Sequence, residues 1–227
     1  MHRILQNSRI LCIKYNSNIE TFIKSIENFG ILAALSWQQN KWACEPEITD
    51  RKKSNFSFVK EHGILYESLT FGHEKYPCEK DNMYIGYTPT FQFHFPNIDN
   101  SKNLKIVFFR SMNPLRNQQY IVGFYAFPEL DKFERKAKHP IFKEYTCGNI
   151  KARQSDIVLF QNTIMLDNEI AQKKHYIPPF KKLSNRGWNY LHSQNVLQIL
   201  ESAIKANPGD KKIISVSSRI KNEIEKK

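Results

Sequence analysis

The chain has 227 residues, of which 41% are hydrophobic and 25% are charged. This length suits one large or two small globular domains with a substantial buried core. No apolar run approaches the roughly 20 residues that a membrane-spanning helix needs. The N-terminal segment is interrupted by polar residues at positions 6–9, unlike a secretory signal peptide. We therefore expect a cytoplasmic protein without a membrane partner.

The charge balance is strongly basic, with 34 Lys and Arg against 22 Asp and Glu and a formal net charge of +12. Residues 132–186 contribute twelve Lys or Arg against five Asp or Glu, a net +7. A clustered excess of this kind favours a polyanionic partner, most simply nucleic acid, because bound phosphates release their counterions. The alternative interpretation is a solvated basic surface.

In the first half of the chain, apolar residues recur at helical spacing over residues 19–29, after Ser17 or Asn18 as the N-cap and before Gly30 as the stop. Residues 31–37 continue as a turn or a strand, and the polar residues 37–55 predict a long loop. Short apolar or alternating runs predict strands at residues 10–15, 64–71, 83–87 and 90–95.

The centre of the chain predicts a β-hairpin. Residues 106–109 and 120–127 are rich in β-branched and aromatic residues, and both runs are continuous enough for strands that are buried on two faces. Between them, Asn113, Pro114 and Asn117 supply turn chemistry, because proline fixes φ and asparagine tolerates left-handed backbone.

Towards the C-terminus, residues 131–139 predict a loop or short helix, and residues 157–160 and 163–166 predict two paired strands. A helix is expected over 194–205 with Ser193 as its cap, and Asn207, Pro208 and Gly209 end it. The pattern indicates an α+β domain over residues 1–210 with an N-terminal helix, a sheet core at about 60–167 and C-terminal helices. Residues 211–227 form a further helix or a linker.

The sequence carries no known catalytic signature. It has no phosphate-cradling glycine loop, no zinc-protease helix motif and no serine-hydrolase motif. Its four cysteines, at positions 12, 44, 78 and 147, are scattered in the manner of reduced structural thiols, and the pair His73 and Cys78 has no matching second pair for a metal. We expect no cofactor, no metal and no catalysis. The enzyme alternative is a small metal-dependent nuclease that uses Glu129, Asp131 and Lys132.

The hairpin resembles the paired strands of PUA-like domains of the EVE and YTH type. The resemblance lies in the Phe109-Arg110-Ser111 step at the end of the first strand and in the run that begins Ile121-Val122-Gly123 in the second. It implies a small twisted β-barrel that holds a flipped or single-stranded modified base in an aromatic pocket, with Ser111 on the pocket side. The same group supplies N-terminal specificity domains of McrB-type modification-dependent restriction proteins, which implies a motor domain or nuclease as a partner.

Together these observations predict a nucleic-acid-binding module that reads a modified or flipped base, most simply in DNA, for a restriction system. The alternative is an RNA-binding protein of the same fold. The expected base pocket consists of Trp37, Trp42, Phe93, Ser111 and Asn113. The expected phosphate contacts are Arg110, Arg116, Lys173, Lys174, Lys181, Lys182 and Arg186.

Overall fold

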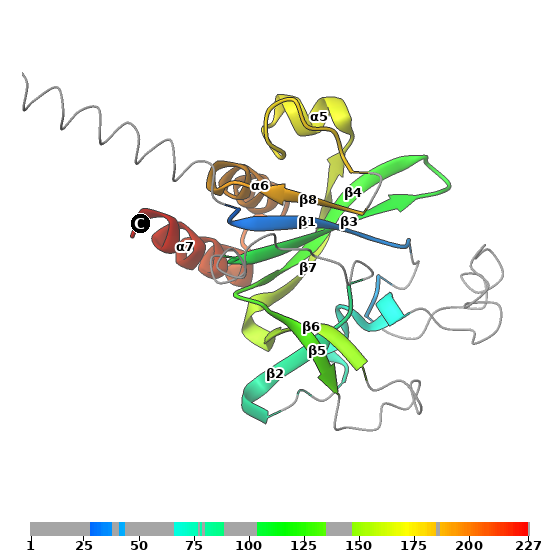
Figure 1. The fold of residues 1–227 in the computed structure, drawn as a ribbon, viewed down its shortest axis with the longest axis vertical. Coiled ribbons are helices and arrows are strands. Elements are labelled where there is room, and N and C mark those ends of the chain that lie inside the picture. The colour runs from blue at the N-terminus through cyan, green and yellow to red at the C-terminus, as the bar shows by residue number, and fades with distance from the viewer. Residues whose placement is uncertain are drawn as a thin grey trace, which may run out of the picture.

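The structure is a computed structural model that describes residues 28–37, 41–43, 66–76, 78, 80–88, 104–134, 147–184 and 187–226. Within them, three layers are stacked: helices, a five-stranded sheet, and a smaller three-stranded sheet on the opposite side (Figure 1). The chain is therefore α+β, as predicted. The predicted N-terminal helix at 19–29 and the predicted strands at 10–15 and 90–95 lie outside the described residues, apart from the last two positions of that helix.

The five-stranded sheet is open and has the strand order β7-β4-β3-β1-β8. Neighbours pair antiparallel except β1 and β3, which are parallel. Its strands are β1 (Gly30–Leu35), β3 (Ile106–Asn113), β4 (Gln118–Ala126), β7 (Ile157–Leu166) and β8 (Trp188–Leu191). The described strands do not close into a barrel.

The predicted central hairpin is present as β3 and β4. Asn113 ends β3, and its side-chain oxygen accepts a hydrogen bond from the backbone of Leu115 at 2.9 Å. Asn117 occupies the left-handed region with φ 48° just before β4 begins. Gly123 faces the backbone of β7 so closely that a Cβ there would lie 2.3 Å from the carbonyl oxygen of Val158. The hairpin is thus shaped by the residues that predicted it.

Side chains of the hairpin alternate between two hydrophobic cores. Phe108 and Phe124 belong to the core under the helices, while Val107 and Tyr125 belong to the core shared with the smaller sheet. All four are fully buried. Successive residues of a strand point to opposite faces, so continuous apolar runs are what a sheet covered on both sides requires.

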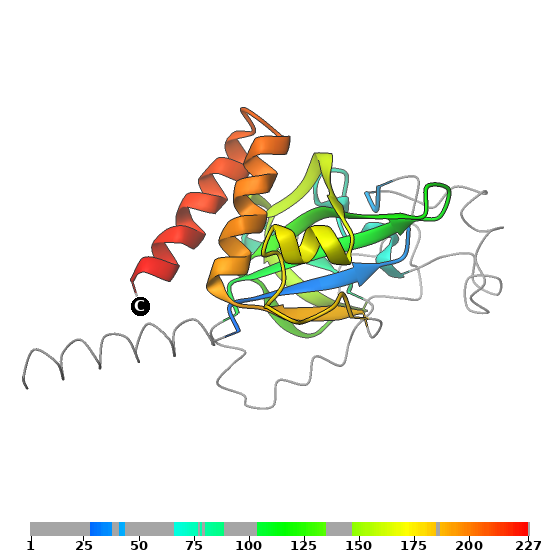
Figure 2. The same cartoon turned by 90° about the horizontal axis from the view of Figure 1, so that it is seen from above.

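The helical layer consists of α5 (Asn168–Lys173), α6 (Ser193–Ala206) and α7 (Lys211–Glu225). Figure 2 shows α6 and α7 side by side, joined by a short connection. The cap of α6 is His192, in a reciprocal capping box with Asn195, and not Ser193 as predicted. Asp210 caps α7 by accepting hydrogen bonds from the backbone of Lys212 and Ile213. No helix in the described part of the chain is long and apolar enough to cross a membrane.

The smaller sheet, in the order β2-β6-β5, was only partly predicted. Strand β2 (Met83–Gly86) matches the expectation, but β5 (Glu129–Glu134) replaces the start of the expected loop or helix at 131–139. Strand β6 (Cys147–Arg153) was not predicted. Residues 66–69 form a 3-10 turn and not the strand expected at 64–71, and a second 3-10 turn follows at 72–74. Strand β7 is one continuous strand where two were expected.

The packing of α7 gives a direct test of the helical layer. Ile220 is fully buried in the core under the helices, whereas Ile214 on the same helix is 44% exposed. Ile220→Ala should therefore lower the free energy of unfolding by about 2–5 kcal/mol, because it removes buried methyl groups and leaves a cavity. Urea unfolding measures the change. The matched variant Ile214→Ala should cost less than about 1 kcal/mol; equal effects would contradict the packing of α7.

Candidate nucleic-acid interface

A groove of about 700 Å³ lies between β8, at the edge of the five-stranded sheet, and the segment of residues 178–184 that follows α5. We call it the lysine groove. Its lining includes Asn168, Lys181, Lys182, Trp188, Asn189, Tyr190 and His192. Both lysines are exposed, and both aromatic rings are partly buried. The lining thus contains two exposed lysines and two aromatic residues, whose rings pack in part against the core shared with the smaller sheet.

The backbone that carries the two lysines is held on its inner side. The side chain of Asn189 accepts a hydrogen bond from the backbone of Ser184 at 3.0 Å and donates one to the carbonyl of Lys182 at 2.8 Å. The side chain of Asn168 accepts from the backbone of Leu183 at 2.8 Å, and the Leu183 side chain is buried. The lysine ammonium groups can therefore reach solvent from a fixed backbone.

The lysines supply the positive charge of the groove near neutral pH. Burial lowers the pKa of His192, so its imidazole, which also caps α6, is neutral there. Burial also raises the pKa of Tyr190, against the effect of a hydrogen bond with Trp188, and its hydroxyl stays protonated. The side chains of Trp188, Tyr190 and His192 are thus neutral and can form stacking or hydrogen-bond contacts with a ligand in the groove.

Four of the seven predicted phosphate contacts lie at the end of α5 or in the segment that follows it. Lys173 and Lys174 lie at the end of α5, close in sequence to the groove lysines Lys181 and Lys182, and all four are exposed. Arg116 is exposed, but it lies in the β3–β4 turn. Arg186 lies outside the described residues. Of these lysines, Lys181 and Lys182 line the lysine groove, whereas the charge of Lys174 acts on Glu201 of α6.

Arg110 has a different place from the one predicted. It is only 7% exposed, and its guanidinium donates to the carbonyl of Ser184 at 2.7 Å and to the side chain of Gln119. Its Nε is buried without a hydrogen-bond partner among the described residues, and burial lowers the pKa of the guanidinium. Since the charged group points into the protein, Arg110 supports the groove segment from the sheet and does not present itself to a phosphate.

A second candidate region lies just beyond the end of β1, where Trp37, Trp42 and Tyr120 form what we call the aromatic corner. The rings of Trp37 and Trp42 meet edge to face with centroids 5.9 Å apart, and Trp37 lies 6.5 Å from Tyr120. Trp42 is 2% exposed and donates its indole hydrogen to the carbonyl of Ser36 at 2.8 Å. Trp42 is thus part of the core, while Trp37 and Tyr120 remain partly exposed.

The other predicted pocket residues are engaged within the fold. Ser111 is buried, and its hydroxyl donates to the carbonyl of Leu35 at 2.8 Å. The side chain of Asn113 accepts two backbone hydrogen bonds of the hairpin turn. Phe93 lies outside the described residues. Of the predicted set, Trp37 therefore keeps an accessible ring at the aromatic corner.

Glu67 was not identified from the sequence, although it lies beside the aromatic corner. It is 6% exposed and accepts hydrogen bonds from the backbone and hydroxyl of Ser36. Removal from water raises the pKa of its carboxyl to about 7, against the effect of these hydrogen bonds. Burial and the nearby charge of Glu67 also raise the pKa of Tyr87. A single acidic residue in an apolar segment was the signal available in the sequence.

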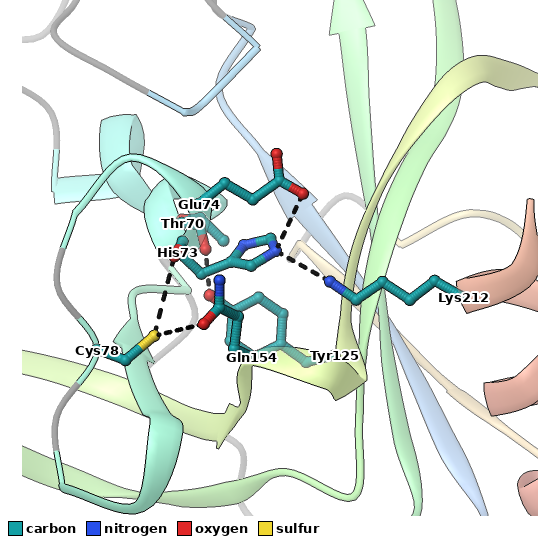
Figure 3. Close-up of polar contacts among 7 residues, drawn as sticks. All are labelled: Thr70, His73, Glu74, Cys78, Tyr125, Gln154 and Lys212. Atoms are coloured by element: carbon teal, nitrogen blue, oxygen red, sulfur yellow. Dashed lines mark hydrogen bonds and ion pairs between the residues drawn. The ribbon is translucent and has the colours of Figure 1, made fainter.

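His73 forms the centre of a polar cluster with Glu74 and Lys212 (Figure 3). Its side chain is 3% exposed, and its Nε2 lies 3.3 Å from Nζ of Lys212. Burial, and then the charge of Lys212, lower the pKa of His73 to about 4. Nδ1 is buried without a hydrogen-bond partner in the described part of the chain. The imidazole is therefore neutral and accepts a hydrogen bond from Lys212.

The neighbouring Cys78 does not form a nucleophilic pair with this imidazole. Its sulfur lies 3.4 Å from the side-chain oxygen of Gln154 and 3.8 Å from the backbone carbonyl of His73 (Figure 3). Burial raises the pKa of the thiol. A catalytic cysteine needs a lowered pKa and contact with its base, and this geometry provides neither.

The residues of the nuclease alternative lie in the smaller sheet. Glu129 and Asp131 are within β5, and Glu129 forms an ion pair with Lys151 at 3.0 Å. Glu129 also lines a charged cleft of about 680 Å³ together with Asp156, which pairs with Arg219. The described residues include no group of three His, Cys, Asp or Glu that could hold a metal ion. Glu129 and Asp156 are thus each paired with a basic side chain.

Comparison of the chain with protein-family models, with curated proteins and with solved structures gives no match in any of the three. The resemblance to PUA-like domains therefore rests on the hairpin residues alone.

The buried imidazole predicts a loss of stability in mild acid. The pKa of His73 is about 4 in the folded chain and near 6.5 in an unfolded one, so only the unfolded state gains a proton between these values. Stability should fall as the pH drops through 6.5, by about 2 kcal/mol for this group between pH 7.5 and pH 5. Urea unfolding at the two pH values measures it.

In this experiment His73→Gln should reduce the difference between the two pH values by about that amount. His175→Gln, which removes an exposed imidazole, serves as the matched control and should leave the difference as it is in the unchanged chain. An unaltered difference in His73→Gln would show that the imidazole is not held neutral by burial.

Proposed function

We propose that this chain is a nucleic-acid-binding module that holds the phosphate backbone in the lysine groove. The observation that carries the proposal is the pair Lys181 and Lys182, which is exposed on a backbone fixed by Asn189 and bordered by Trp188 and Tyr190. Lysine ammonium groups bind phosphate as point charges, and aromatic rings beside them stack on bases. A groove with both features suits a polymer that carries both phosphates and bases.

The charge distribution supports the same proposal. Lys173 and Lys174, at the end of α5, are exposed as well, and the whole chain carries +12. Each phosphate that is neutralised releases condensed counterions, so affinity falls with salt by a slope of about 0.9 per contact on duplex DNA and about 0.7 on single strands. Contacts of this kind position the nucleic acid without reading its sequence.

A modified or flipped base is the feature that we propose the module reads, as the targeting part of a modification-dependent restriction system. The resemblance of the hairpin to PUA-like domains supports this proposal. We propose a PUA-like organisation of the domain on the same ground. Trp37 is the residue that we assign to the base, because its ring is partly exposed and is held edge to face by buried Trp42. A base that leaves its stack can be held on such a ring.

The groove lysines give the first test. The double variant Lys181→Ala, Lys182→Ala should weaken binding to all sequences alike, by about tenfold or more at low salt, and should reduce the salt slope by one to two contacts. Fluorescence anisotropy with labelled oligonucleotides at several salt concentrations measures both quantities. Competition with unlabelled tRNA in the same assay separates a preference for DNA from one for RNA.

The control for this test is Lys80→Ala, Lys211→Ala, which removes the same charge from two exposed lysines outside the groove. Its effect should be clearly smaller. If the two double variants lose affinity equally, the chain has only a diffuse basic surface, and if the unchanged chain binds no nucleic acid at low salt, the proposal fails.

The base-reading part has its own test. Trp37→Ala should reduce the preference for a modified over an unmodified duplex by tenfold or more, because the stacking ring is lost, while the salt slope stays as in the unchanged chain. Duplexes with 5-methylcytosine, 5-hydroxymethylcytosine or 6-methyladenine provide the comparison. Equal losses on modified and unmodified DNA would remove Trp37 from the base site. Trp42→Ala is unsuitable here because it would open a cavity in the core.

A further inference from the structure

We infer that the lysine groove takes single-stranded nucleic acid, and that Phe180 stacks on an unpaired base next to the bound backbone. The inference rests on the proposed function and names its substrate class. Phe180 directly precedes the two groove lysines and was not among the residues that the sequence analysis selected.

Phe180 contributes no packing to the protein. Its side chain is 100% exposed, more than any other large hydrophobic residue in the described part of the chain. Leu183, three residues later in the same segment, is buried and belongs to the core under the helices. The segment could therefore bury an apolar side chain, yet it leaves its only aromatic one in water.

The backbone at Phe180 is also unusual. Its φ of 63° lies in the left-handed region, which a bulky residue occupies only at a cost. The flanking contacts impose this conformation: the backbone of Lys181 donates to the carbonyl of Pro178 at 3.2 Å, and the side chain of Gln172 donates to the carbonyl of Lys181. Pro178 itself is buried. Strain that the surroundings maintain is common at binding sites, because it fixes a side chain where a ligand needs it.

The surroundings of Phe180 define the ligand. Lys181 and Lys182 follow it directly and are both exposed, so a ligand that touches the ring lies within reach of their ammonium groups. The ligand must then combine negative charge with flat apolar faces. In a duplex the base faces are covered by their neighbours, whereas in a single strand they are open to aromatic side chains. Single-stranded nucleic acid meets both conditions.

An anionic membrane surface would also attract lysines next to an aromatic residue. Binding at a membrane surface generally needs a broad apolar face. Here Phe180 is the one large apolar side chain exposed in the segment of residues 178–184, and the groove beside it is lined by Asn168, Asn189 and the two lysines together with the partly buried Trp188 and Tyr190. The structure therefore favours the nucleic acid, and the membrane becomes an outcome of the test.

The test compares Phe180→Ala with the unchanged chain on a labelled single strand of 12 nucleotides and on a duplex of the same length, by fluorescence anisotropy. Stacking on one base predicts a fivefold to 100-fold loss of affinity for the single strand, less than twofold for the duplex, and an unchanged salt slope on both. Phe180→Trp keeps a stacking face and should restore single-strand binding.

Two controls accompany the variant. Leu115→Ala removes another strongly exposed apolar side chain, 75% exposed in the β3–β4 turn, and should leave binding unchanged. Phe180→Gly removes the ring and relieves the left-handed backbone, so it should match Phe180→Ala in binding without any loss of thermal stability. Together they separate loss of the ring from loss of the fold.

The outcomes also separate this inference from the function on which it rests. If Lys181→Ala, Lys182→Ala weakens binding and Phe180→Ala does not, the stacking role is overturned and the phosphate groove stands. If Phe180→Ala weakens duplex and single strand equally, the preference for a single strand is overturned. If it leaves oligonucleotide binding unchanged but abolishes binding to vesicles that contain phosphatidylserine, the ligand of Phe180 is a membrane.

Discussion

The structure depends on the burial of both faces of the β3–β4 hairpin. Phe108 and Phe124 stack edge to face under the helices, with ring centroids 5.9 Å apart, and Phe109 and Tyr125 do the same on the other side at 5.6 Å. An open sheet with two apolar faces is stable in water only when something covers each of them. The helices cover one face of the five-stranded sheet and the smaller sheet covers the other, so neither face is open to a ligand.

The lysine groove lies at the β8 edge of the five-stranded sheet. Among the described strands, β8 pairs with β1 alone, and the segment after α5 runs along β8, where Asn189 holds it. Arg110 links the same segment to the interior, because its guanidinium reaches the carbonyl of Ser184 from the middle strand of the sheet. A buried guanidinium is costly to desolvate. Its hydrogen bond to Ser184 fixes the groove segment relative to the sheet.

Two buried ionisable groups give the fold opposite responses to pH. The pKa of Glu67 is raised to about 7, so its contribution to stability is present in acid and is lost as the pH rises from 4.5 to 7. The pKa of His73 is lowered to about 4, so stability falls as the pH drops from 6.5. Both shifts arise mainly from removal of the group from water. Partial cancellation between them is expected in mildly acidic solution, which is why the single variants are informative.

Local patterns by themselves determined the hairpin with its asparagine turn, the basic segment that contains Lys181 and Lys182, and the helix that ends at Asn207, Pro208 and Gly209. These features follow from periodicity, turn chemistry and charge, which neighbouring residues share. The same patterns left residues 211–227 open between a helix and a linker. The tertiary structure alone decided that residues 66–69 form a 3-10 turn, that β6 pairs between β2 and β5, and that Trp42, Ser111 and Arg110 turn inward. It also decided that Phe180 stays in water beside the lysines. Pairing and burial depend on residues far away in the chain, so no local pattern could show them.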